Sequence, residues 1–225
     1  MNFPTIQVNN FFDNIDTILD FSKNQNFDYD KLGYYPGQRT KCISELDFDL
    51  FVYINSKIFR LFYPDYNTFN SVEWKALTYF QKIKYEDIDL YARNNGRGWI
   101  HKDHFSLLTS IVYLTPNDLS SGTSIYKSKK EGLNMISKEQ DIKRDYHKRQ
   151  IVDKKSYYKL LNENHSYYDE VSHFKSNFNS LIAFDSAQPH SANYNIQPGE
   201  ERLTLITFLN YLKVPYFPIP EMNKI

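Results

Sequence analysis

The segment RLTLITFLNYL, residues 202–212, sets a cation inside an apolar run. Successive side chains of a β-strand point to opposite faces, so alternate residues of an extended segment share one face. On one face of this segment lie Arg202, Thr204, Ile206 and Phe208. Burying a cation there is costly without an anion, and a guanidinium offers a rigid fork of donors that suits a carboxylate. We therefore expect a β-rich fold that holds a dicarboxylate against Arg202.

A second pattern places candidate metal ligands together. If the segment GWIHKDHF is extended, His101 and Asp103 project on the same side, while Lys102 and His104 face away. The segment NSLIAFDS is typical of a short buried strand that ends in a turn, and His190 follows it within five residues. Two histidines and one carboxylate can form a facial triad around iron, which leaves other coordination positions open for chemistry.

The order His-x-Asp, His, Arg-x-Thr resembles the Fe(II)/2-oxoglutarate-dependent dioxygenases, specifically their prolyl-hydroxylase-like branch. The segments SIVYLTP (residues 110–116) and SSGTSIY (residues 120–126) are also similar to that branch. This resemblance spans residues 91–211, about half of the chain. The N-terminal part is more weakly similar to uncharacterised phage and bacterial members.

The resemblance implies a mainly β protein with flanking helices, built as a double-stranded β-helix (a cupin-like jelly roll). The Fe(II) ligands it implies are His101, Asp103 and His190. The keto-acid end of 2-oxoglutarate would chelate the iron, and O2 would take the remaining position. Arg202, with Tyr113 or Thr204, would hold the distal carboxylate. The implied reaction is hydroxylation of a substrate with conversion of 2-oxoglutarate to succinate.

Each residue taken alone has a plainer explanation. Six histidines in 225 residues make a chance His-x-Asp pair unsurprising, and a lone buried histidine is more often a core residue than a ligand. Tyr113 is one of 19 tyrosines, and most strand tyrosines serve packing. Thr204 suits a strand because its side chain is β-branched. The ordered combination on expected strands is what favours the iron site.

Two other function classes stay open at this point. The main alternative is a jelly-roll module that binds metal with little or no turnover, and a metal-dependent hydrolase or isomerase is a lesser one. Arg202 discriminates among them, because neither alternative needs an anchor for 2-oxoglutarate. The substrate of an oxygenase could be a peptidyl side chain, a free amino acid or a small metabolite, and the oligomeric state is not predicted.

The length of the chain predicts a single domain over residues 1–225. Within it we expect an N-terminal helical elaboration at residues 1–73, whose longest helix covers residues 44–63. Residues 74–212 are the expected jelly-roll core, with an inserted segment at residues 127–176.

The inserted segment is polar and basic. Residues 127–155 hold ten Lys or Arg against five acids, and Ser137 with Gln140 can form a capping box for a helix. A solvated helical face is favoured over a lid on the iron site. Three further histidines lie in this polar stretch without ligand spacing and are predicted to be surface residues: His147, His165 and His173.

The segment YPGQRT contains a second candidate cation. Pro36 and Gly37 fit a turn, and a surface-turn position for Arg39 is favoured over one at the substrate mouth. Tyr34, Tyr35 and Trp99 fit either a pocket wall or plain core.

The net charge is zero and the pI about 7.0, so the composition makes no electrostatic case for nucleic acid or an anionic membrane as partner. One cysteine, Cys42, excludes an intrachain disulfide and fits a reducing cytoplasm. The opening MNFPTIQVNN has no signal-peptide pattern, and no apolar run reaches membrane-spanning length. We expect a cytoplasmic protein, or one in a host cytoplasm if a phage encodes it, with a small-molecule or peptide substrate.

Overall fold

Two antiparallel sheets face each other in this computed structural model, which describes residues 3–64, 72–88, 90–115, 121–129, 137–148 and 153–218. The strand order of the larger sheet is β1 (Ile6–Val8), β8 (Leu181–Asp185), β5 (Leu108–Tyr113), β10 (Glu201–Lys213), β4 (Glu73–Lys84), β3 (Gln38–Arg39) and β2 (Asp28–Tyr29). The order of the smaller sheet is β7 (Tyr168–Lys175), β6 (Gly122–Ser128) and β9 (His190–Asn193). Together they form the predicted double-stranded β-helix.

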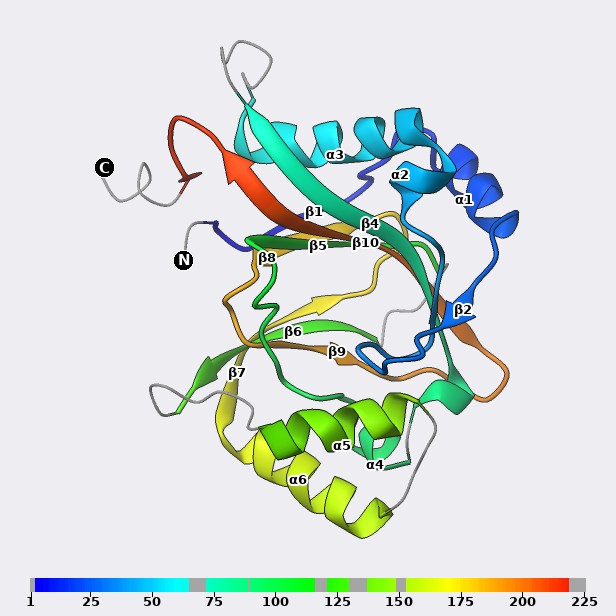
Figure 1. The fold of residues 1–225 in the computed structure, drawn as a ribbon, viewed down its shortest axis with the longest axis vertical. Coiled ribbons are helices and arrows are strands. Elements are labelled where there is room, and N and C mark those ends of the chain that lie inside the picture. Colours follow the sequence, from blue (N-terminus) through cyan, green and yellow to red (C-terminus); the bar gives the residue numbers. More distant parts are fainter. Residues whose placement is uncertain are drawn as a thin grey trace.

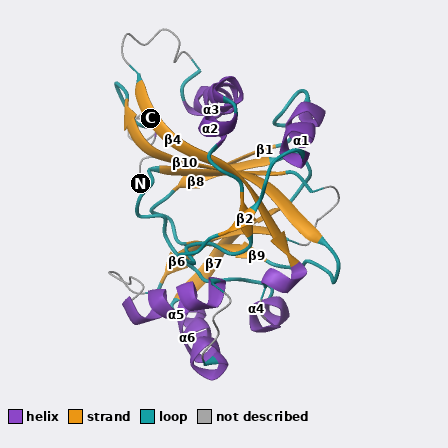
Figure 2. Ribbon diagram, turned by 45° about the vertical axis from the view of Figure 1, so that its right-hand side comes forward, coloured by secondary structure: helices purple, strands orange, loops and turns teal. Residues whose placement is uncertain are grey.

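Helices cover the outer sides of both sheets (Figures 1 and 2). At the top of Figure 1, above the larger sheet, lie α1 (Ile15–Lys23), α2 (Ile43–Leu46) and α3 (Phe48–Phe62). At the bottom, beyond the smaller sheet, lie α4 (Leu90–Asn95), α5 (Ser137–His147) and α6 (Lys154–Ser166). The fold is therefore layered as helices, large sheet, small sheet and helices. Among the described residues, no helix is both long and apolar enough to cross a membrane.

The expectation of one helix over residues 44–63 is wrong, because the chain breaks at Asp47 into α2 and α3. The backbone of Asp47 is extended, with φ −156° and ψ 104°. Its carboxylate accepts the N–H of Leu50 at 2.9 Å and so satisfies a free donor of the first turn of α3. The apolar residues on both sides of Asp47 hid this helix start in the sequence.

Strand β10 separates the main hydrophobic core from the interior between the sheets. Leu205 and Leu209 point outward and pack in the core cluster that α1 to α3 share with the large sheet. Arg202, Ile206 and Phe208 point inward and line a cavity. The two-residue period of the segment thus gives the predicted common face, with a cation between the sheets.

Segments outside the expected jelly-roll core also contribute strands. From the N-terminal part, β1 pairs with β8, and β3 pairs with β4. From the inserted segment, β7 pairs with β6 along its length. Residues 130–136 and 149–152 of that segment lie outside the described residues. Both sheets are therefore wider than residues 74–126 and 177–212 alone would make them.

Candidate metal centre

His101 and His190 are held opposite each other by their own backbones. The N–H of His101 donates to the carbonyl of His190 at 3.0 Å, and the N–H of His190 donates to the carbonyl of His101 at 2.9 Å. The ring centroids are 4.5 Å apart. Because His190 also begins β9, which pairs with β6, this bridge attaches the His-x-Asp segment to the smaller sheet.

Asp103 completes a group of three side chains that could bind a metal ion. Its N–H donates to the carbonyl of Ser186 at 3.0 Å, so the chain stays extended for two residues beyond the bridge. The Asp103 carboxylate lies 3.7 Å from Nε2 of His101 and 3.4 Å from Nε2 of His190. The ligand atoms of the three residues all lie within 4.8 Å of one another. The structure thus brings together the three side chains singled out from the sequence, while His104 is exposed on the following turn.

The second ring nitrogen of each histidine fixes which nitrogen carries the proton. Nδ1 of His101 lies 3.0 Å from the carbonyl of Trp99, and Nδ1 of His190 lies 2.9 Å from the carbonyl of Gln188. A carbonyl oxygen only accepts, so each Nδ1 donates and Nε2 of the neutral ring keeps a free lone pair. Both Nε2 atoms face Asp103. This is the tautomer that binds a metal ion, with the ring orientation set by the backbone.

A chain of hydroxyls holds the Asp103 carboxylate. The hydroxyl of Thr109 donates to Oδ2 of Asp103 at 2.7 Å and contacts the hydroxyl of Ser186 at 2.8 Å. Ser186 in turn donates to Ser106 at 3.0 Å. All three hydroxyl residues were missed in the sequence. The only available signal was the inward position of Thr109 on a strand that starts just after the His-x-Asp segment.

The charges of the site suit a cation. Burial by itself raises the pKa of Asp103, but His190, His101 and the Thr109 hydroxyl outweigh it and hold that pKa below its usual range. Burial also lowers the pKa of His101 well below 6.5, and the positive charge of Lys143 lowers it further. At neutral pH the site therefore offers one carboxylate and a neutral imidazole, the forms that a metal ion requires.

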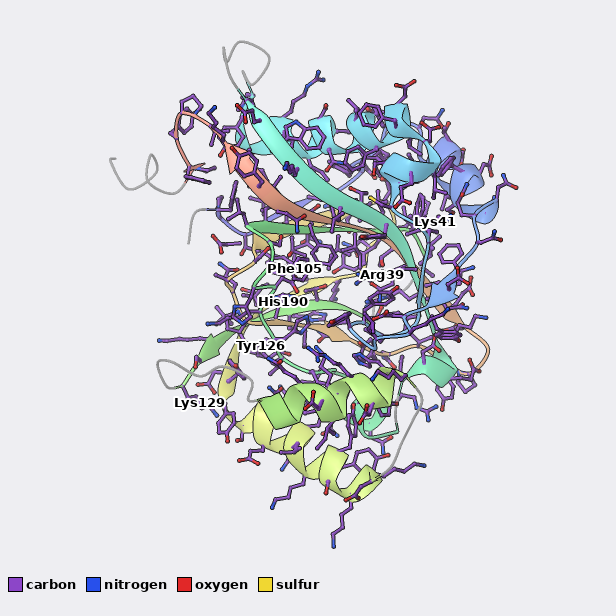
Figure 3. The ribbon with its side chains drawn as sticks, viewed as in Figure 1. Arg39, Lys41, Phe105, Tyr126, Lys129 and His190 are labelled. Carbon is purple, nitrogen blue, oxygen red and sulfur yellow. The ribbon has the colours of Figure 1, made fainter. Side chains whose placement is uncertain are left out.

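The three donors open into a cavity of about 590 Å³ between the two sheets. In Figure 3, His190, Phe105 and Arg39 lie in the space between the sheets. Arg202 lines the same cavity and is 4% exposed. Its NH1 donates to the carbonyls of Gly122 and Asn193 at 3.3 and 3.2 Å, while its buried Nε has no partner among the described residues. An unsatisfied buried guanidinium donor is the feature that a bound carboxylate would remove.

Tyr113 and Thr204 are buried but do not line this cavity. The Tyr113 hydroxyl donates to Thr123 at 2.8 Å, and Thr123 does line it. The Thr204 hydroxyl donates to the carbonyl of Gln81 at 3.4 Å. Tyr113 thus contacts a residue that lines the cavity, Thr123, and the part of Tyr113 and Thr204 in co-substrate binding stays a prediction.

The surface-turn interpretation of Arg39 is wrong. Arg39 lies in β3 and lines the cavity, as do Tyr34, Tyr35 and Trp99. Its guanidinium stacks 3.9 Å over the ring of Tyr35. The preceding loop has glycines with positive φ at both ends, 73° at Gly33 and 70° at Gly37. These let the loop fold back so that the arginine points inward, which no local sequence pattern reveals.

The inserted segment also reaches the cavity, contrary to the favoured solvated face. Lys143 and His147 of α5 line it, and Nδ1 of His147 contacts the carbonyl of Gly33 at 3.1 Å. Burial lowers the pKa of His147 to about 3. His165, in the last turn of α6, is buried, with Nε2 at 2.8 Å from the carbonyl of Gly98. The surface prediction is therefore wrong for both residues and holds only for the exposed His173.

The sequence model of the family of unknown function DUF6445 matches residues 2–209. The chain belongs to this family. The match spans the three grouped donors and Arg202, so the whole candidate site lies within the DUF6445 region. No curated protein matches the sequence.

Solved structures of similar fold include proteins that use or bind 2-oxoglutarate. The non-haem, alpha-ketoglutarate-dependent epimerase SnoN from nogalamycin biosynthesis aligns with a TM-score of 0.54 at 11% identity, over 91% of this chain and 76% of SnoN. HygX from Streptomyces hygroscopicus, solved with nickel, 2-oxoglutarate and hygromycin B, aligns with a TM-score of 0.52 at 9% identity, over 93% of this chain and 83% of HygX. The structure of this DUF6445 member thus resembles the Fe/2-oxoglutarate-dependent oxygenases in fold.

Proposed function

We propose that the protein is an Fe(II)- and 2-oxoglutarate-dependent oxygenase that hydroxylates a small-molecule or peptide substrate. The observation that carries this proposal is the pairing of two features in one cavity. One is the group of two Nε2 lone pairs and a carboxylate within 4.8 Å. The other is Arg202, a buried guanidinium whose Nε lacks a partner among the described residues. A metal-binding module or a hydrolase would need only the first.

The donor set fits Fe(II). Two imidazoles and one carboxylate on one side of a metal are typical of non-haem iron oxygenases, with the remaining positions left for other ligands. His101, Asp103 and His190 would hold the ion, and the Thr109 hydroxyl would keep the carboxylate oriented. Iron together with 2-oxoglutarate supplies oxidation of a substrate by O2, coupled to decarboxylation of 2-oxoglutarate to succinate.

The remaining residues of the site would bind 2-oxoglutarate and exclude water from the cavity. Arg202 would pair with the distal carboxylate of 2-oxoglutarate, satisfying its free Nε, and Tyr113 would contribute through Thr123. Both sheets and α5 would exclude water from the cavity, which strengthens charge interactions inside it. We infer further that the chain is one domain, that it belongs to the prolyl-hydroxylase-like branch and that it acts in the cytoplasm. The single cysteine supports the last point.

Succinate formation tests the proposal. Purified protein is supplied with Fe(II), 2-oxoglutarate and air, and succinate is quantified with and without candidate substrates. Wild type should form succinate only when Fe(II) is present, and His190→Ala should form none. Thr207→Val, which loses a buried hydroxyl contact with Thr78 on β4, is the control and should match wild type. Equal succinate from wild type and His190→Ala would reject the proposal.

A further inference from the structure

The cavity contains more cationic side chains than the proposed binding of metal and 2-oxoglutarate requires. Of its lining residues, five are Lys or Arg and two are Asp. The positive charges of a divalent metal ion and of Arg202 would equal the negative charges of Asp103 and of the 2-oxoglutarate dianion. Asp87 accepts the hydroxyl of Tyr29 and the N–H of Lys84. Apart from Arg202, four Lys or Arg side chains then share the cavity with Asp87 as the remaining acid among the described lining residues.

The guanidinium of Arg39 is fixed in place through Nε and NH2, while its NH1 is left available to a ligand. Its Nε and NH2 donate to Oε1 of Gln81 at 3.3 and 3.1 Å, and Gln81 is itself fixed by the carbonyl of Pro36 at 2.7 Å. One face stacks on Tyr35. No described residue bonds to NH1 of Arg39, and no carboxylate of the described chain pairs with it. A guanidinium braced in this way loses little entropy when it binds an anion.

Arg39 serves a different part of the cavity from Arg202. The backbone of Arg39 is in register with Gln81, and Gln81 is in register with Thr204 of β10. Its guanidinium, however, lies 5.3 Å from the ring of Phe208, four residues further along that strand and away from Arg202. The two guanidinium groups thus mark two separate anion positions on one inner face.

Lys143 is the second cation, and it belongs to the inserted segment. It lies on α5, lines the cavity and has no ion pair among the described residues, whereas the neighbouring Arg144 approaches Asp141 at 3.8 Å. Lys143 and His147 are four residues apart on α5 and so share one face of that helix, and His147 contacts the carbonyl of Gly33 in the loop that precedes Arg39. Lys143, Arg39 and the metal-ligand residues all line the same cavity.

The cavity wall around Arg39 is largely aromatic. The rings of Tyr35, Tyr79 and Phe208 have their centroids within 5.6 Å of its guanidinium, and Phe105 packs on Phe208. The backbone of Arg144 on α5 packs directly on Gly33, so the loop of residues 30–37 and α5 meet beside the cavity. A volume of about 590 Å³ suits a small molecule.

We propose that the prime substrate is a small organic anion, whose carboxylate or phosphate is bound by Arg39 and Lys143 and whose aromatic or apolar body packs on Tyr79, Phe105 and Phe208. This inference rests on the proposed function and specifies its substrate class. Arg39 and Lys143 are specificity residues in this account, and the anionic group anchors the substrate so that its body faces His101 and Asp103.

Ligand-observed NMR tests this on protein saturated with Zn(II) and 2-oxoglutarate, a diamagnetic and redox-inactive state. The probes are benzoate and phenyl phosphate, each compared with the uncharged benzamide and benzyl alcohol. The anions should bind wild type at least about 10-fold more tightly than the neutral probes, since a charge-assisted hydrogen bond contributes that much or more. Arg39→Lys, Arg39→Gln and Lys143→Gln should each weaken anion binding by at least about 10-fold. The exposed Arg60→Gln and Lys159→Gln are matched controls and should bind as wild type.

Equal binding of charged and neutral probes to wild type would overturn the inference, as would anion binding that survives all three cavity substitutions. Binding of an acidic hexapeptide in preference to both small anions would overturn the small-molecule class. The same samples report binding of 2-oxoglutarate. If wild type binds 2-oxoglutarate but shows no anion preference, only this inference fails. If it does not bind 2-oxoglutarate, the proposed function fails and the inference with it.

Discussion

His101 and His190 exchange backbone hydrogen bonds at 3.0 and 2.9 Å, which places their rings 4.5 Å apart although 89 positions separate them in the sequence. The spacing of the two imidazoles is therefore set by main-chain pairing and not by side-chain contacts. Each ring is further fixed by a bond from Nδ1 to a carbonyl two residues earlier. A metal ion would meet ligands that are already positioned, so binding needs little reorganisation.

Removing either histidine should abolish most metal affinity. His101→Ala and His190→Ala should each weaken Mn(II) binding, measured by calorimetry, by more than the roughly 10–100-fold typical of residues behind the ligands. His104→Ala is the control, because His104 is exposed one residue beyond Asp103. Loss of binding in His104→Ala with retention in His101→Ala would show that the ligand assignment is wrong.

Thr109 should tune the same site without touching the metal. Thr109→Val removes the 2.7 Å hydrogen bond to Asp103 but keeps the shape of the side chain, so Mn(II) affinity should fall by about 10–100-fold. Thr207→Val loses a buried hydroxyl contact with Thr78, 3.0 Å long, on the same sheet. If both variants bind Mn(II) equally well, the hydroxyl does not orient the carboxylate.

Gly33 should allow the loop of residues 30–37 to pack against α5. A Cβ at Gly33 would collide with the backbone carbonyl of Arg144, and φ is +73°, whereas a Cβ at Gly96, where φ is +67°, meets nothing within 4 Å. Both Gly33→Ala and Gly96→Ala carry the backbone strain of about 1 kcal/mol, but only the first separates the loop from α5. Amide exchange in α5 should therefore accelerate at least about 10-fold in Gly33→Ala alone. Equal exchange in the two variants would mean that this contact does not hold α5.

His165 should make the fold sensitive to acid. Burial lowers its folded-state pKa to about 4, from about 6.5 in the unfolded chain. Between these pH values the unfolded chain binds more protons, so this contribution to stability is complete above about pH 6.5 and is lost as the pH falls towards 4. Linkage gives a loss of about 2 kcal/mol at pH 5. His147, whose pKa is lowered to about 3, acts in the same direction.

Urea unfolding at pH 7.5 and pH 5 measures this effect. His165→Gln should lose about 2 kcal/mol less than wild type between the two pH values, because the titrating group is gone. The exposed His104→Gln should keep the wild-type dependence. An unchanged dependence in His165→Gln would contradict a buried neutral imidazole.

Local patterns within one or two strands were enough to predict two features. These are the grouping of the three metal-ligand side chains and the inward orientation of Arg202. A two-residue period fixes which side chains share a face, whatever lies around them. Arg39, Lys143 and His147 were beyond such reasoning, because they reach the cavity only when the loop of residues 30–37 and α5 are brought together from 100 positions apart. His165 was missed for the same reason, since its burial depends on Arg97 and Gly98 of another segment. The break at Asp47 was a local signal that the surrounding apolar residues obscured.

The binding of 2-oxoglutarate with and without metal tests the central claim most directly. Calorimetry on the apo protein and on the Mn(II)-loaded protein should show 2-oxoglutarate binding that metal strengthens, with the reciprocal gain in metal affinity that linkage requires. Arg202→Lys should bind Mn(II) normally but 2-oxoglutarate about 10- to 150-fold more weakly, because the charge remains while the forked geometry is lost. Binding of 2-oxoglutarate that is independent of metal, or equal in wild type and Arg202→Lys, would contradict the account.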